Sequence, residues 1–421
     1  GGLYTDFSQE STIMKKGFVL IGSLFLVVFI AIFLSIALMR TEIQLKAIEL
    51  RRLSQCAFYA AETGIERSIF ELRRNSIWRA GLMNQTVTWN GPGPMGSLIG
   101  VYTVSLADGP NAGNLRTVWI LSEGRAGQNQ QIRRFIRVRV FVQNLASYFT
   151  STMYNLTIGS GTVINGNVLA RDIAFEINAA LSESDPQKKI YLTGDVEYLR
   201  NISGDKNPHV NIDGTVSKRA PVTFVSVDVE RYREIAINQN GRYVDGSISH
   251  TSGDINLENL ETQNGLVFAE GDVHISGNVT ESMHIVSAGN IYIDGDITCV
   301  TDDNGKRQIG LSAVGDVVIS GSAPSNVNVD AYIMSNSGQF RAEKTPAGRA
   351  ALNFNGAISV RGAEGMRTTV DLNEYSQRNY TYDETLNSSI QIPFMSYIVN
   401  TLEWRETVPS EVFPPAGGDA A

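Results

Sequence analysis

The most distinct hydrophobic pattern in the chain is an uncharged stretch from Phe18 to Leu38, composed mostly of Phe, Leu, Ile, Val and Ala. A helix over these residues rises about 30 Å at about 1.5 Å per residue, which matches the hydrocarbon thickness of a bilayer. Lys15 and Lys16 flank its N-terminal end. The pattern therefore predicts a transmembrane segment at 18–38 with a cytoplasmic N-terminus.

The helical pattern continues beyond the apolar stretch. No proline occurs from Arg40 to Ser76, so one helix of about 59 residues is expected to leave the membrane and continue outside it. Apolar or small residues recur on one face at helical spacing: Ile43, Ala47, Leu50, Ser54, Ala57, Ala61, Ile65, Ile69 and Leu72. The small residues in the middle of this face allow another helix or a sheet to approach closely.

Residues 85–142 change to an alternating pattern, in which apolar and polar residues take turns between Gly- and Asn-rich breaks. Such alternation is typical of half-buried strands. The candidate strands are 87–89, 99–106, 115–123 and 132–142. We therefore expect residues 39–145 to combine the amphipathic helix with a four-stranded antiparallel sheet that packs on its C-terminal half.

From residue 146 the chain shows short apolar runs separated by Gly-Asp or Gly-Asn pairs. Gly253-Asp254, Gly271-Asp272 and Gly289-Asn290 are spaced by 18 residues, and Gly315-Asp316 follows 26 later, after an eight-residue insertion near 302–305. The apolar positions of successive repeats align as Val267/Ile285/Leu311, Val273/Ile291/Val317 and Ile275/Ile293/Ile319. Such columns predict a parallel β-solenoid, right- or left-handed, with three short strands per coil.

The solenoid is expected to occupy residues 146–390. A helical pattern near 226–237 predicts a helix inserted between coils. Residues 391–408 are predicted to form a cap over the solenoid end, and 409–421 a disordered tail. The expected fold class is α+β.

Two motifs resemble a known family. The junction Lys15-Lys16-Gly17/Phe18 is similar to the class III signal of type IV pilins, and 57–66 (AFYAAETGIE) is similar to a stretch of PilX-like minor pilins. The resemblance covers residues 14–142. It implies a leader at 1–17, or a four-residue leader if Met14 is the true start, that prepilin peptidase removes between Gly17 and Phe18, with methylation of the new N-terminus.

The resemblance also implies an assembly helix that contacts other pilins, with Ala57, Ala61, Glu62 and Gly64 in its family-like stretch. One departure concerns the fifth mature position, where major pilins carry a glutamate and this chain has Gly22. A buried carboxylate is costly without a partner, so a subunit at the filament tip has no use for one. A minor pilin or pseudopilin that primes or caps a filament is therefore expected, in a pilus or a secretion system. Such a subunit sits in the inner membrane before assembly and in a cell-surface or periplasmic filament afterwards.

Charge and composition exclude some alternatives. The net charge of the 421-residue chain is −8, and residues 81–421 hold 25 Lys and Arg against 36 Asp and Glu, which disfavours nucleic acid as the main partner. The two cysteines, Cys56 and Cys299, and the four histidines share no ligand-like spacing, so no metal or cofactor is expected. A disulfide between the two cysteines stays open.

An enzyme is the weaker interpretation. Parallel β-helices often hold polysaccharide lyases and hydrolases, whose chemistry needs clustered acids or calcium ligands. The candidate carboxylates are Asp272, Asp294, Asp296 and Asp316, but each stands beside a glycine, where Asp favours local turn hydrogen bonds. We therefore predict a non-enzymatic structural subunit. The alternatives are a surface adhesin or carbohydrate-binding module that binds surface glycans, and a membrane-anchored polysaccharide-active enzyme.

Overall fold

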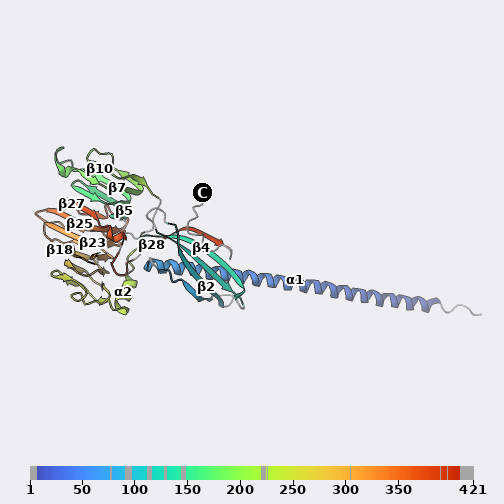
Figure 1. Cartoon of the computed structure of the whole chain (residues 1–421). Helices are drawn as coiled ribbons and strands as arrows, with labels where there is room; N and C mark the ends of the chain where they lie inside the picture. The colour runs from blue at the N-terminus through green and yellow to red at the C-terminus, as the bar shows by residue number, and fades with distance from the viewer. Residues whose placement is uncertain are drawn as a thin grey trace, which may run out of the picture.

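The computed structural model describes residues 7–75, 78–90, 97–110, 116–127, 130–143, 148–219, 224, 226–303, 305–388, 390–395 and 397–407. It consists of one long N-terminal helix, a small antiparallel sheet against the C-terminal half of that helix, and a large curled parallel sheet at the far end (Figure 1). The α+β class expected from the sequence is confirmed. The predicted tail at 409–421 lies outside the described residues.

The helices are α1 (Phe7–Arg74), η3 (Pro186–Lys188, a 3-10 turn), α2 (Val229–Asn238) and α3 (Thr385–Ser388). The antiparallel sheet has the strand order β1-β2-β3-β4-β28 and comprises β1 (Leu82–Asn90), β2 (Ser97–Asp108), β3 (Arg116–Ala126), β4 (Ile132–Gln143) and β28 (Ile398–Thr407). The parallel sheet comprises β5 (Thr150–Gly159), β6 (Thr162–Asn165), β7 (Val168–Glu176), β8 (Ile190–Leu192), β9 (Val196–Ser203), β10 (Val210–Ile212), β11 (Val216–Lys218), β12 (Arg242–Val244), β13 (Ile248–His250), β14 (Asp254–Ile255), β15 (Leu266–Ala269), β16 (Val273–Val279), β17 (Met283–Ser287), β18 (Ile291–Cys299), β21 (Ile309–Ala313), β22 (Val317–Ile319), β23 (Asn326–Ser335), β24 (Phe340–Ala342), β25 (Arg349–Val360), β26 (Val370–Asp371) and β27 (Tyr375–Tyr382). A separate hairpin is formed by β19 (Thr301–Asp302) and β20 (Gly305–Lys306), within the predicted insertion.

Helix α1 divides into two halves. Its N-terminal half projects from the body of the molecule (Figure 1), and its apolar side chains from Leu24 to Leu50 are exposed. Its C-terminal half buries Ala60, Ala61 and Ile65 against the antiparallel sheet. The single long helix expected from Phe18 to Ser76 is confirmed over residues 18–74. It begins earlier than expected, at Phe7, and ends at Arg74.

The antiparallel sheet contains the four predicted strands and one more. The alternation in β4 directs Ile136, Val138 and Val140 to the helix, and all three are fully buried. The fifth strand, β28, pairs antiparallel with β4 from Ile398 to Thr407. These residues were expected in a cap at 391–408, so that prediction is wrong for the part that forms β28: the segment completes the sheet on the long helix.

The apolar columns of the parallel sheet have the predicted register. Val267 pairs with Ile285 and Ile285 with Leu311 through β15, β17 and β21. The columns that begin at Val273 and Ile275 continue into β18 and β22 in the same way. The inward side chains form one continuous core along the sheet.

The first predicted repeat is wrong. The Gly271 amide donates to the Gly246 carbonyl at 2.8 Å, so the corner below Gly271 is Gly246 and not Gly253. Gly253 lies at a different corner, where its carbonyl accepts from the Asn278 amide. The coil before Gly271 is longer than 18 residues because it carries the turn from 256 to 263, whose Leu260 is buried in the end of the core.

The strands do not stack in chain order. Residues 242–382 form one series of stacked parallel strands. The last strands of this series pair with the first strands of the earlier segment, Ile358 of β25 with Thr150 of β5 and Tyr380 of β27 with Ile164 of β6. From there β5 to β11 extend the sheet in the opposite part of the molecule (Figure 1). The chain therefore enters and leaves the parallel sheet at its middle, next to β4 and β28.

Helix α2 matches the helical pattern predicted near 226–237 but lies elsewhere than expected. Its N-cap Asp228 accepts a hydrogen bond from the Arg231 amide. Tyr232 and Ile235 pack on the outer side of the parallel sheet, against Phe268, together with the segment around Met395. The helix thus covers an apolar outer face, whereas the sequence predicted an insertion between coils.

Candidate functional site

The projecting half of α1 is the first candidate site. Its side chains are exposed around the whole circumference, as at the successive residues Phe25, Leu26 and Val27. Within the described residues it is the one helix long and apolar enough to cross a membrane. A helix that is apolar all round requires a lipid or protein environment on every side.

The polar groups of this half are satisfied within the helix. The hydroxyls of Ser35 and Thr41 donate to the carbonyls of Ala31 and Ala37, at 2.8 and 2.9 Å. Beyond the apolar stretch, Lys46 forms an ion pair with Glu42 at 2.6 Å. Since unpaired polar groups are costly in hydrocarbon, this arrangement is compatible with a bilayer.

The predicted processing and assembly residues are distributed along the whole of α1. Gly17 and Phe18 lie in its helical backbone, and Gly22 is exposed with open space around it. Ala57, Ala61 and Gly64 lie instead against the antiparallel sheet, and Glu62 stands at the edge of that contact, half-buried. The structure therefore does not bring the two groups together.

The small residues permit very close packing of helix and sheet. A Cβ added at Gly64 would lie 2.3 Å from Ser122 Oγ and 2.9 Å from Tyr102. A Cβ added at Gly124 would lie 1.9 Å from the carbonyl oxygen of Ala57. Of the two partners that the small-residue face allowed, a helix or a sheet, the sheet of the same chain is the one present.

The four candidate carboxylates take part in hydrogen bonds between neighbouring coils. Asp272 accepts from the Asn290 amide at 2.7 Å, Asp296 from Asn328 at 2.8 Å and Asp316 from Gln339 at 2.8 Å. The side-chain oxygen of Asn290 in turn accepts from the Asp316 backbone amide at 2.8 Å. The corner residues thus form a ladder along the stack, whereas the Gly-Asp pairs predicted hydrogen bonds local to each turn.

Asp294 differs from the other three. It lies 2.8 Å from His274 Nδ1 and accepts from the Ser322 hydroxyl at 3.2 Å, while His274 stacks on Tyr292 at 4.6 Å between ring centres. The hydroxyl contacts the carboxylate and not the imidazole, so the order of a nucleophile, a base and an orienting acid is not formed.

The cysteines are both free thiols in the structure. Cys56 is buried under β2 and directs its sulfur to the Ile99 carbonyl, and burial raises the pKa of its thiol. The described residues contain no cluster of three or more His, Cys, Asp or Glu side chains able to hold a metal ion.

His284 is completely buried and joins the outer segment to the parallel sheet. Its Nδ1 donates to the Pro393 carbonyl at 2.8 Å, and its Nε2 lies 2.8 Å from the Ser312 hydroxyl. Burial lowers the pKa of His284 to about 4, so the imidazole is neutral at pH 7. Sequence reasoning missed this role, because no spacing distinguishes His284 from the other histidines.

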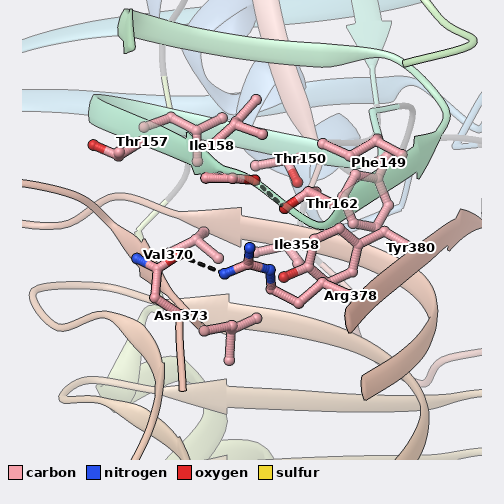
Figure 2. A pocket seen from close by; sticks show the side chains of 14 residues that line it. Phe149, Thr150, Thr157, Ile158, Thr162, Ile358, Val370, Asn373, Arg378 and Tyr380 are labelled. Carbon is pink, nitrogen blue, oxygen red and sulfur yellow. Dashed lines mark hydrogen bonds between the residues drawn. The ribbon is translucent and has the colours of Figure 1, made fainter. Parts of the chain in front are cut away.

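The parallel sheet encloses a cavity of about 30 Å³ where its two chain segments meet. Figure 2 shows Arg378 crossing it toward Asn373, with Tyr380 alongside. Arg378 is only 5% exposed, and burial lowers the pKa of its guanidinium. No sequence signal marked Arg378, because the β27 pattern assigns it only to a strand.

No protein-family model matches the chain, and no curated protein matches it. Among solved structures, the chain is similar to the competence-associated pilin ComZ from Thermus thermophilus, with a TM-score of 0.33 and 14% sequence identity over 84% of this chain and 97% of that chain. A likeness this distant carries no argument about function.

Proposed function

We propose that this chain is a minor pilin or pseudopilin that primes or caps a type IV pilus-like filament. The observation that carries the proposal is α1: its apolar half is fully exposed, while the same helix continues into a half that packs on an antiparallel sheet. An exposed apolar helix needs a membrane before assembly and other helices afterwards. A subunit that moves from inner membrane to filament meets both needs.

The proposal extends to the large domain. The in-register apolar columns, the corner ladder and the parallel pairing all support a β-solenoid that the filament displays. Because the large domain is inserted between β4 and β28, it is attached to the sheet on α1 through two paired strands and not through a single linker. The engagement of Asp272, Asp296 and Asp316 in backbone hydrogen bonds favours a structural, non-enzymatic role, with surface glycans as candidate ligands of the displayed face.

Two features support a position at the filament tip: Gly22 replaces the glutamate that major pilins carry, and the exported domain is large. A large domain repeated at every subunit of a tight filament would overlap with its neighbours, and the tip relieves this constraint. We expect sub-stoichiometric incorporation, measured by mass spectrometry of filaments purified from the native host. Restoring the carboxylate with Gly22→Glu should not improve incorporation, so a clear gain would contradict the tip position.

Processing is tested on the same material. Prepilin peptidase is expected to cut after Gly17, so N-terminal sequencing of the mature chain should begin at a methylated Phe18. A mature chain that begins at Leu38, or retains its leader beside active peptidase, would exclude the pilin assignment.

A matched pair of variants separates membrane insertion from general effects. Leu26 and Leu45 are 61% and 62% exposed, but only Leu26 lies in the apolar stretch. A lysine near the middle of a membrane span costs about 2.5–3.5 kcal/mol. Leu26→Lys should therefore deplete the chain from the membrane fraction and from filaments, while Leu45→Lys should leave membrane insertion unchanged. Equal partitioning of both variants would show that 18–38 is not the span.

A further inference from the structure

The cavity at the middle of the parallel sheet is lined by Arg378, a buried positive charge that has no salt-bridge partner among the described residues. Arg378 makes no ion pair with any described carboxylate. One guanidinium nitrogen donates to Asn373 Oδ1 at 2.5 Å and the other terminal nitrogen to the Ser160 carbonyl, both neutral acceptors. Asp371 accepts from the Asn373 side-chain amide at 3.1 Å, and its charge raises the pKa of Arg378, against the larger lowering by burial, without forming an ion pair. A buried charge without a partner is strongly unfavourable.

One donor of Arg378 is also unused. Its Nε is buried and has no hydrogen-bond acceptor among the described residues. Tyr380 lines the same cavity and is 6% exposed. One unpaired donor, the Arg378 Nε, and a buried positive charge therefore border this cavity.

Arg349 shows how the same sheet satisfies a buried arginine without a ligand. It is equally buried at 5% exposure and also lacks a carboxylate partner within the described chain. Its donors contact the carbonyls of Ser320, Ala323, Pro324 and Glu343 and the Tyr375 hydroxyl. Arg349 is thus saturated by backbone oxygens, and Arg378 is not.

The size of the cavity limits the ligand. A water needs about 10–15 Å³ measured in this way, so about 30 Å³ holds two or three waters or one small ion. The rest of the lining is largely apolar, including Ile158, Ile164 and Ile358, and offers little to a sugar or a larger oxyanion. Waters fill the space but do not compensate the charge.

We propose that this cavity binds a monovalent anion of chloride's size, held by the Arg378 guanidinium and the Tyr380 hydroxyl. The ion would lie between β27 of the later chain segment and β5 and β6 of the earlier one, so it joins the two segments at their only direct stacking contact within the described residues. The inference rests on the cavity alone and is independent of the filament role.

The test uses the full chain in detergent micelles. Chloride replaces gluconate at constant sodium concentration and ionic strength, and unfolding of the sheet is followed by circular dichroism. A ligand that binds only the folded state raises Tm with the logarithm of its concentration above Kd. The wild type is expected to show this rise, Arg378→Gln to lose it, and Arg349→Gln to retain it despite a lower starting Tm.

Two further measurements keep the proposal falsifiable if Arg378→Gln does not fold. Gly159→Ala places a Cβ 2.9 Å from Asn373 Oδ1 and 3.6 Å from an Arg378 nitrogen, so it should weaken the chloride effect. Crystals grown in bromide should show an anomalous peak beside Arg378 Nε. The proposal is overturned if Tm is the same in chloride and gluconate, if Arg349→Gln and Arg378→Gln lose the effect equally, or if the bromide crystals show only water in the cavity.

Discussion

Replacing Ile293 with Asp is expected to unfold the middle of the parallel sheet. Ile293 is fully buried, and it stacks between Ile275 below and Ile319 above in one apolar column. The neighbouring residue, Tyr292, points outward and stacks on His274. The two adjacent positions therefore test the register directly.

The free-energy cost of Ile293→Asp can be worked out from the burial of the isoleucine side chain. Removing a fully buried isoleucine side chain forfeits about 1.5–3 kcal/mol, and an unpaired carboxylate in its place adds several kcal/mol. The sum is comparable to the total stability of a typical domain, about 5–15 kcal/mol. Ile293→Val should cost only about 0.5–1.5 kcal/mol. Tyr292→Asp should cost about 1 kcal/mol, the contribution of one aromatic stack.

The chain offers two separate signals for the assay. All four tryptophans, at 78, 89, 119 and 404, belong to the helix–sheet unit of α1 and none to the parallel sheet. Urea unfolding of the full chain in micelles can therefore be followed by tryptophan fluorescence for the first unit and by far-UV circular dichroism, which also includes the second. We expect Ile293→Asp to shift the circular dichroism transition far more than the fluorescence transition. Equal losses for Ile293→Asp and Tyr292→Asp would refute the register.

Three further predictions concern other contacts. Gly124→Ala should force α1 from the sheet, because its Cβ would meet the Ala57 carbonyl. The free energy of unfolding followed by fluorescence should fall by about 1–3 kcal/mol, with little change in the parallel sheet; an unchanged value would contradict the packing. Asp272→Asn should be tolerated, since an amide oxygen still accepts from Asn290, whereas Asp272→Ala should cost about 1–3 kcal/mol in urea unfolding; equal costs would exclude the ladder. The pKa of His284 is about 4 in the folded chain against 6.5 unfolded, so its contribution to stability is complete above pH 6.5 and declines as pH falls toward 4; thermal unfolding of His284→Gln should lack that part of the wild-type decline.

The sequence predicted the local part of the fold well, for a physical reason. In a stacked sheet each apolar residue contacts the equivalent residue of the next coil, so the columns through Ile275, Ile293 and Ile319 appear as a period in the chain. The buried face of α1 was likewise predicted from apolar and small residues that recur at helical spacing. The corner position of Asp272 was predicted from the turn preferences of Asp beside glycine, but its hydrogen bond to Asn290 was not.

The pairings that the sequence did not predict are long-range. Residues 398–407 were predicted as part of a cap, because the pairing of β28 with β4 depends on where the intervening chain returns. The contact of β25 with β5 reverses the chain order and has no periodic signature. The cavity around Arg378 arises at that contact, so it could not be predicted without the stacking order.

The entry and exit of the chain at one place have a mechanical consequence. Gln143, at the end of β4, pairs with Ile398, at the start of β28, so the large domain is connected to the sheet on α1 through two adjacent strands. A load applied to that domain is divided between two covalent tethers, and both pull on their strands from the same end. The pair β4–β28 is then not peeled apart, and two attachment points resist swivelling that a single linker would allow. Under tension the domain should therefore keep its orientation relative to the sheet on α1, whereas a domain on a single linker would rotate freely.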